Sequence, residues 1–322
     1  MTRLVLCYPV EARHQAQIAA AAPWAEVVNA GQERIAAEIL AADLFCGHAK
    51  VPMPWDEVVR KGRLRWIQSS AAGLDHCLTP AVVESDIVVT SASGVLANQV
   101  SEHAVALATA LCRGLKGFFA AQGRKEFIRR PTRDLHHSTV GIVGFGGVGR
   151  RLAEVLAPFK TRILATDAFP IERPPHVAEL LPADRLDDLL RQADFLFLAA
   201  PLTAATRGMI DDAQLAQMKV DSYLINMARG PLVVEAALVR VLESGRLAGA
   251  ALDVTEVEPL PPGSRLWEMP NVIITPHVAG QSARRIDDMT DFLCENLRRY
   301  RAGLPLLNLV DKRLGFPVRQ LR

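Results

Sequence analysis

One segment near the middle of the chain constrains the fold more than any other, TVGIVGFGGVGRRLAEVL at residues 139–156. An apolar run typical of a buried strand leads into a GxGxxG turn, and a helical pattern follows at once. Gly144 permits the tight turn, Gly146 lets the backbone approach a pyrophosphate, and Gly149 lets the helix pack closely on the strand. The amino end of the helix adds free N–H groups and a partial positive charge. GxGxxG alone is common, but this context predicts a dinucleotide-binding Rossmann unit.

The next apolar run, RILAT, predicts which dinucleotide is bound. It ends at Asp167, eighteen residues beyond Gly149. A carboxylate there can accept both hydroxyls of an adenosine ribose and would repel a 2′-phosphate, which favours NAD over NADP. NADP binding would require Arg162 or Arg173 to lie close by, and an ordinary capping aspartate is the structural alternative.

Alternating strand and helix patterns extend this interpretation to the whole chain. The 322 residues, half of them hydrophobic, suit two domains with separate cores. Such alternation is typical of parallel sheets covered by helices, so we expect an α/β fold with two parallel-sheet domains. The expected strands are LVLCY, DLFCG, LRWIQSS and DIVVTS, then TVGIVG, RILAT, DFLFLAA, SYLINMA, AGAALDV and NVIIT.

Three helical stretches stand out besides the one at the glycine turn. They are residues 33–42, residues 101–119 and residues 283–303. The second is expected to be one long apolar helix, with Asn98 or Ser101 as its cap. A polar, arginine-rich segment without periodicity follows it, at residues 122–137.

Composition excludes several classes of protein. The formal net charge is +2, and no basic stripe suggests binding to nucleic acid or to an anionic membrane. No apolar stretch approaches the ~20 residues of a membrane span, and Pro9 and Glu11 interrupt the first apolar run too early for a signal peptide. The five cysteines lack CxxC spacing, so we expect neither disulfides nor a metal site, and a cytoplasmic location. They are Cys7, Cys46, Cys77, Cys112 and Cys294.

Polar residues follow three later strands of the expected nucleotide domain. SYLINMARG ends in Arg229, GAALDVTEVEPL supplies Asp253 and Glu258, and NVIITPHVAG supplies His277. Ligands of open parallel sheets bind beyond the carboxyl ends of the strands. We therefore expect a guanidinium, carboxylates and an imidazole to converge where a nicotinamide would lie.

These groups suit the reduction of a 2-oxo acid. Arginine can bind the carboxylate and carbonyl oxygens, and histidine can protonate the carbonyl oxygen while a carboxylate holds its ring. Each residue also has a structural interpretation: Arg229 as a surface cation, Glu258 as the residue before Pro259, and His277 as a loop histidine.

The chain as a whole resembles the D-isomer-specific 2-hydroxyacid dehydrogenases. The matching stretches, in order, are SSAAGLDH, VSEHAVAL, TVGIVGFGGVGRRLAEVL, PLTAATRGMI, NMARGPLVVEAALVRVLESGRLAGAALDV, EPLPPGSRLWEMPNVIITPH and HVAG. The resemblance implies a Rossmann NAD-binding domain at residues 100–289. It also implies a discontinuous, flavodoxin-like substrate domain at residues 1–99 and 290–322, with the active site in the cleft between the domains.

The resemblance also implies roles for individual residues. Arg229, Glu258 and His277 are the expected catalytic residues: Arg229 binds substrate, and His277 is the acid/base paired with Glu258. Backbone amides at Ala72 and Gly73 hold the substrate carboxylate. The expected cofactor-binding residues are Gly144, Gly146, Gly147, Val148, Gly149, Asp167, Pro201, Thr206, Ala228, Asp253 and Gly280.

Family members are commonly dimers joined through the helix that begins near Ser101 and the arm after it, although burial within one subunit explains that apolar helix equally well. The sequence departs from the family pattern at His137-Ser138, Val234 and Thr255, and only the pocket shape near Thr255 becomes less certain. Because the sequence ends soon after the helix at residues 283–303, we do not expect the regulatory domain that some phosphoglycerate dehydrogenases carry.

The resemblance predicts an NAD-dependent reductase of a small 2-oxo acid, with glyoxylate and hydroxypyruvate as the expected class. A dinucleotide-sensing protein like the C-terminal-binding corepressors shares the fold and the catalytic residues, but the compact ends favour the enzyme. Glu258 argues against a formate-dehydrogenase-like activity. In the loop CGHAKVPMPWDEV, residues His48, Met53 and Trp55 either set the size of the pocket or pack as ordinary loop residues.

Overall fold

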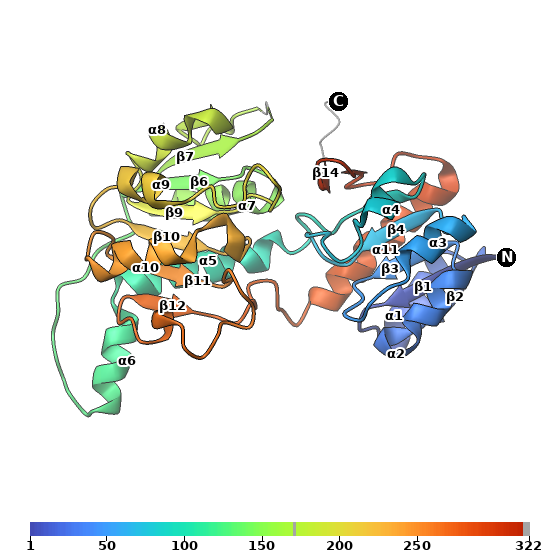
Figure 1. Cartoon of the computed structure of the whole chain (residues 1–322), viewed down its shortest axis with the longest axis horizontal. Coiled ribbons are helices and arrows are strands. Elements are labelled where there is room, and N and C mark those ends of the chain that lie inside the picture. Colours follow the sequence, from blue (N-terminus) through green and yellow to red (C-terminus); the bar gives the residue numbers. More distant parts are fainter. Residues whose placement is uncertain (170–171, 318–322) are drawn as a thin grey trace. The chain divides into compact units, whose positions relative to one another are not determined.

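The structure is a computed structural model that describes residues 1–169 and 172–317. The chain divides into two compact units (Figure 1). Unit 1 comprises Met1–Leu96 and Ser282–Arg322, and unit 2 comprises Ala97–Gln281. Each unit is built around one parallel sheet, so the prediction of two parallel-sheet α/β domains is confirmed. The assignment of a substrate role to one unit and a nucleotide role to the other stays a prediction.

Unit 1 contains a five-stranded parallel sheet of order β2-β1-β3-β4-β5. Its strands are β1 (Thr2–Cys7), β2 (Ala25–Asn29), β3 (Leu44–Gly47), β4 (Trp66–Ser69) and β5 (Val88–Thr90). Its α-helices are α1 (Ala12–Ala21), α2 (Gly31–Glu38), α3 (Trp55–Lys61), α4 (Pro80–Glu84) and α11 (Arg285–Ala302). The direction of strand order reverses between β1 and β3, the flavodoxin-like arrangement.

Both faces of this sheet are covered, which explains why its strands are almost continuously apolar. Ile35 of α2, Val58 of α3 and Val82 of α4 are buried against one face. Ile18 of α1 and Leu293 of α11 are buried against the other. The closing helix α11 thus packs on the same sheet as the first residues of the chain.

Unit 2 contains a seven-stranded parallel sheet of order β12-β11-β10-β9-β6-β7-β8. Its strands are β6 (Thr139–Val143), β7 (Arg162–Asp167), β8 (Glu179–Pro182), β9 (Phe195–Leu198), β10 (Tyr223–Asn226), β11 (Gly249–Leu252) and β12 (Val272–Ile274). Its α-helices are α5 (Ala97–Cys112), α6 (Leu115–Gly123), α7 (Gly147–Leu156), α8 (Leu186–Leu190), α9 (Asp212–Gln217) and α10 (Glu235–Glu243). The order reverses between β6 and β9, and the carboxyl ends of these two strands form the point where a Rossmann fold binds its ligand.

Helices cover both faces of this sheet too (Figure 1). Side chains of α8, α9 and α10 form one core with one face, and side chains of α5 and α7 form a second core with the other. The apolar character of α5 is therefore explained in part by burial within its own unit.

Two expectations about the long apolar helix are wrong. The stretch is two helices, α5 and α6, bent by 67°. Gly114 breaks it because this residue adopts a left-handed conformation with φ +65°, which glycine does at little cost and which ends helices. The expected caps Asn98 and Ser101 lie inside α5, which begins at Ala97.

Two short strands were not expected from the sequence. They are β2 and β8, which have the sequences AEVVN and ELLP and lie at sheet edges, where every side chain except that of Ala25 is half-buried or exposed. The tail after α11 adds a small antiparallel pair, β13 (Val310–Asp311) and β14 (Phe316–Pro317). Among the described residues, no single helix is long and apolar enough to cross a membrane, although the bent pair α5–α6 meets that test by length and composition alone.

Candidate active site

The glycine-rich turn joins β6 to α7 with very little space between them. Gly144 has φ +91°, and a Cβ on it would lie 2.6 Å from the Ala200 nitrogen. A Cβ on Gly149 would lie 2.1 Å from the Gly144 carbonyl oxygen, so the first turn of α7 packs directly against the backbone of the turn. Both positions therefore require glycine for packing within the protein itself.

Gly146 differs from its two neighbours in the motif, because a Cβ on it would meet nothing within 4 Å. Gly146 is the N-cap of α7, and Gly147 and Val148 are the first residues of the helix. The first N–H groups of a helix have no partner inside it and attract anions. This open cradle fits the diphosphate of a dinucleotide, which α7 would hold through its free N–H groups.

Asp167 lies at the carboxyl end of β7, beside the glycine-rich turn. Its Oδ2 accepts a hydrogen bond from Phe145 N at 2.7 Å, and its Oδ1 accepts one from Phe169 N at 3.0 Å. Arg162, at the opposite end of β7, pairs with Glu179 and donates to Gln192. Arg173 donates to the carbonyl of Val177. The carboxylate is thus oriented toward the turn, and both arginines bind other partners.

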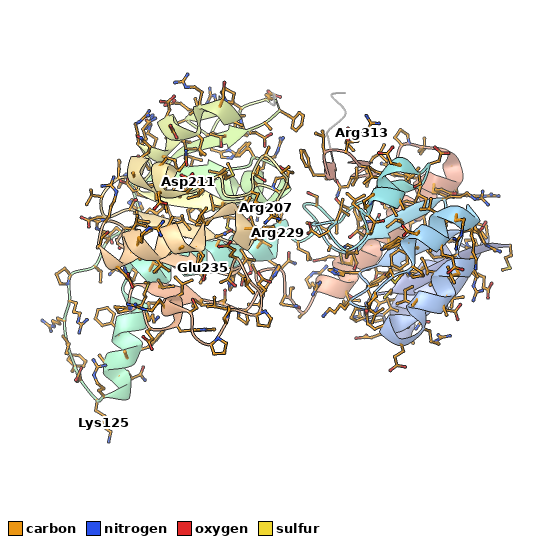
Figure 2. All side chains as sticks on the ribbon, in the orientation of Figure 1. Lys125, Arg207, Asp211, Arg229, Glu235 and Arg313 are labelled. Atoms are coloured by element: carbon orange, nitrogen blue, oxygen red, sulfur yellow. The ribbon has the colours of Figure 1, made fainter. Side chains whose placement is uncertain are left out.

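The structure brings Arg229, Asp253 and His277 to one edge of unit 2. These residues follow β10, β11 and β12, which are consecutive neighbours in the sheet and run parallel. Figure 2 shows Arg229 on the side of unit 2 where Arg207, from the loop after β9, also lies. The expected convergence of these polar residues at the carboxyl ends of the strands is therefore present.

The turn that carries Arg229 is held by a buried amide. Asn226 is 1 % exposed, its Nδ2 donates to the Arg229 carbonyl at 3.0 Å, and its Oδ1 accepts from Ala228 N at 3.1 Å. A Cβ on Gly230 would lie 1.8 Å from the Thr255 carbonyl oxygen. The Arg229 turn therefore packs directly on the turn that leads to Glu258, whose Oε1 accepts from Thr255 N at 3.3 Å.

Asp253 anchors the loop that carries His277. It is 1 % exposed, and its Oδ1 accepts from Thr275 Oγ1 at 2.6 Å and from Val278 N at 2.9 Å. Its Oδ2 accepts from Ala279 N at 2.9 Å. His103 of α5 supports this cluster, because its Nε2 lies 2.9 Å from Thr275 Oγ1.

His277 itself adopts a left-handed conformation with φ +53°, which is uncommon for any residue except glycine. Its N–H donates to the Asp253 carbonyl at 2.8 Å, so Asp253 also holds the left-handed backbone of His277 in place. Its Nδ1 lies 2.8 Å from Glu258 Oε2. Both side chains are substantially exposed, at 51 % and 38 %. The carboxylate orients the ring and leaves Nε2 as the nitrogen that can exchange a proton with a ligand.

The remaining expected cofactor residues lie in loops at the same end of the sheet. Thr206 Oγ1 donates to the Pro201 carbonyl at 2.7 Å, which closes the loop after β9. Ala228 precedes Arg229 and accepts from its Nη1 at 2.6 Å. Gly280 follows Ala279, the last residue bound to Asp253. These positions suit a cofactor contact, and their role stays a prediction.

The expected carboxylate-binding residues lie in unit 1, in the loop after β4. Ala72 is exposed and Gly73 half-buried. Ser69 holds the start of this loop, because its Oγ donates to the Ala71 carbonyl and accepts from Ala71 N, both at 3.0 Å. Whether these amides meet a substrate stays a prediction.

The sequence alone did not indicate His76 or His103. His76 stands at the end of SSAAGLDH and stacks on His48, while Met53 and Trp55 pack in the core of unit 1. His103 lies in VSEHAVAL, on a helix whose apolar pattern hides the polar contact it makes. Both histidines belong to stretches that carry the family resemblance, and this was the only signal for them.

In the part of the chain that the structure describes, no cluster of three or more His, Cys, Asp or Glu side chains could hold a metal ion. The arrangement instead combines a helix terminus with free N–H groups, a carboxylate beside it, an arginine and a carboxylate-oriented imidazole. Together these groups can bind a dinucleotide and an organic acid and move a proton.

Comparisons with known proteins agree with this chemistry. Residues 105–279 match the model of the D-isomer specific 2-hydroxyacid dehydrogenase NAD binding domain. A glyoxylate reductase from Thermofilum pendens is 36 % identical over 260 residues, which cover 77 % of this chain and 75 % of the relative. A glycerate dehydrogenase from Methylorubrum extorquens is 35 % identical over 269 residues, covering 80 % of this chain and 82 % of the relative.

Solved structures extend the similarity to almost the whole chain. An NADPH-dependent glyoxylate/hydroxypyruvate reductase from Sinorhizobium meliloti, in complex with NADP and sulfate, has a TM-score of 0.83 at 29 % identity. The match covers 98 % of this chain and 100 % of that one. A D-isomer specific 2-hydroxyacid dehydrogenase from Xanthobacter autotrophicus, in complex with NADPH and MES, has a TM-score of 0.84 at 29 % identity, covering 98 % and 99 %.

Proposed function

Because this chain belongs to the D-isomer specific 2-hydroxyacid dehydrogenases, which are oxidoreductases, we propose that it interconverts a small 2-oxo acid and its D-2-hydroxy acid with NAD(H). The substrate class we propose is glyoxylate and hydroxypyruvate. Relatives named glyoxylate reductase and a neighbour named glyoxylate/hydroxypyruvate reductase support this choice.

A bound nicotinamide dinucleotide would supply the hydride for the reduction. Arg229 would bind the carboxylate and the carbonyl oxygen of the 2-oxo acid through its planar fork. His277 would donate a proton from Nε2 to the carbonyl oxygen, and Glu258 would orient the ring. In the oxidising direction the same nitrogen would accept the proton.

The observation that carries the proposal is the contact between His277 Nδ1 and Glu258 Oε2 at 2.8 Å, on a loop that the buried Asp253 fixes in a left-handed conformation. A histidine that merely packs in a loop requires neither a carboxylate on its ring nor a left-handed backbone held by a buried aspartate. The Arg229 turn packs against the turn that carries Glu258, which links all three catalytic candidates.

We propose NAD rather than NADP as the cofactor. Asp167 places a negative charge beside the glycine-rich turn, where it would accept ribose hydroxyls and repel a 2′-phosphate. The structural neighbours that hold NADPH or NADP are at most 29 % identical, so they do not decide the preference here. The ratio of kcat/KM for NADH and NADPH measures it directly, and Asp167→Ser should move that ratio toward NADPH.

A homodimer joined through α6 and the segment after it is also part of the proposal. In Figure 1 this arm extends away from the sheet of unit 2. It exposes large apolar side chains, with Phe119 at 65 % and Phe127 at 98 %. Such exposure is unusual for a monomer and is typical of an interface. Light scattering tests this proposal: the wild-type protein should have the mass of a dimer, and Phe119→Ser should shift the mass toward that of a monomer.

The free, buried thiols suit a reducing compartment and support the proposal of a cytoplasmic location. Small 2-oxo and 2-hydroxy acids are the proposed ligands, with no role for nucleic acid, membrane or a metal ion.

The decisive experiment follows NADH oxidation with glyoxylate, hydroxypyruvate, pyruvate and larger 2-oxo acids. We expect turnover with the smallest acids and a loss of about 10²–10⁴-fold in kcat for His277→Ala, with NADH affinity retained. His136→Ala is the matched control. This exposed histidine lies just before the amino end of β6, whereas the candidate site lies at the carboxyl ends of the strands. If none of these acids is reduced although NADH binds tightly, the result would favour a dinucleotide-sensing protein.

A further inference from the structure

Residues 255–258 of unit 2, which end at Glu258, have very little backbone support. In the part of the chain that the structure describes, these residues form no hydrogen bond from one backbone group to another. Val257 is 58 % exposed, so burial of its side chain does not hold the segment either. The position of Glu258 therefore depends on contacts made by side chains.

Two contacts hold the start of this segment. The peptide between Thr255 and Glu256 lies against Gly230, where a Cβ would come within 1.8 Å of the Thr255 carbonyl oxygen. Glu235, labelled in Figure 2, begins α10. Its Oε2 accepts from Glu256 N at 3.4 Å, and its N–H donates to Glu256 Oε2 at 3.1 Å. The first two residues of the segment are thus anchored to other parts of unit 2, and the next two lie beyond these anchors.

The hydroxyl of Thr255 connects the anchored residues to the rest of the segment. Thr255 is 7 % exposed, and its Oγ1 donates to the Val257 carbonyl at 2.8 Å. Among the described residues this is the only hydrogen bond that Val257 makes. A threonine hydroxyl that bonds to the backbone nearby closes a local turn. The hydroxyl therefore fixes the direction in which the chain enters Glu258.

Glu258 uses both oxygens of its carboxylate around this turn. Oε1 accepts from Thr255 N at 3.3 Å, and Oε2 lies 2.8 Å from His277 Nδ1. The carboxylate thus reaches back across the turn to Thr255 while it contacts the imidazole. Because Glu258 is 38 % exposed, packing around the carboxylate is incomplete, and its contact with His277 depends on the shape of the turn.

We propose that Thr255 is a positioning residue whose hydroxyl shapes the turn that holds the Glu258 carboxylate on Nδ1 of His277. The inference rests on the proposed function and adds to it a residue that acts only through Glu258. It assigns no proton transfer to Thr255.

A pair of substitutions at Thr255 tests the role of the hydroxyl. Thr255→Val keeps the branched shape and removes the hydroxyl, whereas Thr255→Ser keeps the hydroxyl. The single-turnover rate of NADH oxidation with the best 2-oxo acid of the panel reports the chemical step. Loss of one hydrogen bond that orients the acid/base pair should lower this rate by about 3- to 10-fold in Thr255→Val. Thr255→Ser should restore it.

The KM for the 2-oxo acid separates this role from general support of the site. Gly230 packs on the Thr255 carbonyl, so a change that merely disturbs the loop would also move the Arg229 turn and raise KM. A change that acts through Glu258 should lower the rate and leave KM and the Kd for NADH nearly unchanged.

A double-mutant cycle with Glu258→Gln provides a second test. Once the carboxylate is gone, a residue that acts only through it has nothing left to position. Thr255→Val should therefore lower the rate no further in the Glu258→Gln background, whereas independent effects would multiply.

Thr161→Val is the matched control. This half-buried threonine also donates from its hydroxyl to a backbone carbonyl, that of Leu156 at 3.0 Å, but it lies just before the amino end of β7. Its loss should leave the single-turnover rate unchanged. Thr255→Ala removes the hydroxyl in a smaller side chain and replaces Thr255→Val if that variant folds poorly, and urea unfolding reports the folding of each variant.

A wild-type rate in the variants without the hydroxyl would overturn the proposal, as would an equal loss in Thr255→Ser. The same fold-loss with and without the Glu258 carboxylate would overturn it too, and so would a rise in KM without a fall in the rate. Each of these results leaves the dehydrogenase intact. Absence of wild-type turnover with every acid of the panel would instead refute the proposed function.

Discussion

A matched pair of glycine substitutions would test whether the turn between β6 and α7 binds a dinucleotide. In Gly146→Ala the new methyl group would meet no protein atom within 4 Å, and Gly146 has an extended backbone with φ −73°. A glycine-to-alanine change in a compatible conformation alters stability by about 0.4–1 kcal/mol. In Gly149→Ala the methyl group would lie 2.1 Å from the Gly144 carbonyl oxygen. Relieving that contact requires backbone movement and should cost about 3 kcal/mol.

The two variants should therefore separate binding from folding. The methyl group of Gly146→Ala would occupy the space in which a diphosphate approaches the first N–H groups of α7. Losing one charge-assisted hydrogen bond costs about 1.5–3 kcal/mol, which corresponds to roughly 10- to 150-fold in affinity. We expect Gly146→Ala to fold with nearly unchanged stability and to bind NADH that much more weakly.

Urea unfolding without cofactor gives the free energy of unfolding of each variant, and fluorescence titration gives the Kd for NADH. NADH should raise the Tm of wild-type protein, with a much smaller effect on Gly146→Ala at the same concentration. Wild-type NADH affinity in Gly146→Ala would refute the assignment of this turn to the cofactor. Equal stability of the two variants would refute the packing argument for Gly149.

Three other outcomes are expected from the structure. Although burial opposes ionisation, a backbone N–H and two arginines hold the pKa of Asp43 below its usual value, so its stabilising effect is present above the unfolded pKa near 4 and is lost as the pH falls below it. Asp43→Asn should cost about 1–2 kcal/mol in urea unfolding at pH 6, and the difference should shrink toward pH 3; a pH-independent difference would contradict this. Burial raises the pKa of Cys77 to about 12 and that of Cys7 to about 11, so iodoacetamide at pH 8 should label these thiols only in denaturant, as mass spectrometry can show. His103→Leu should cost about 1 kcal/mol and weaken NADH binding, because Thr275 loses the partner that supports its contact with Asp253; no change in either measurement would show that α5 gives no such support.

The sequence predicted those features whose cause is local. Each interior strand of unit 2 is a short apolar run, and the glycine-rich turn lies within one continuous strand–turn–helix pattern of the sequence. The edge strands β2 and β8 were missed because AEVVN and ELLP are short, carry charged residues and are only partly buried. The break at Gly114 was missed because one long apolar helix and two consecutive apolar helices show the same spacing of hydrophobic residues. A single glycine is also tolerated inside a helix.

The candidate site was predictable as a set of strand ends but not as a geometry. Parallel strands place Arg229, Asp253 and His277 at one edge, and this follows from strand order. The left-handed backbone of His277 and the stack of His48 on His76 depend on contacts between distant segments, which no periodicity records. A sequence pattern therefore predicts which residues lie near one another, whereas the orientation of their side chains depends on packing.

The contacts of Asp253 show why this distinction matters for experiments. A carboxylate can accept about four hydrogen bonds. Oδ1 already accepts from Thr275 Oγ1 and Val278 N, whereas Oδ2 accepts from Ala279 N, so a nicotinamide amide would have to use Oδ2. The same carboxylate therefore holds the His277 loop and is the predicted contact for the cofactor. Asp253→Asn would disturb the His277 loop and the predicted cofactor contact at once. One of its two side-chain positions would become an NH₂ group, which cannot accept the hydrogen bonds that the carboxylate oxygen accepts there. Only a change in the imidazole itself, His277→Ala, can separate proton transfer from cofactor binding.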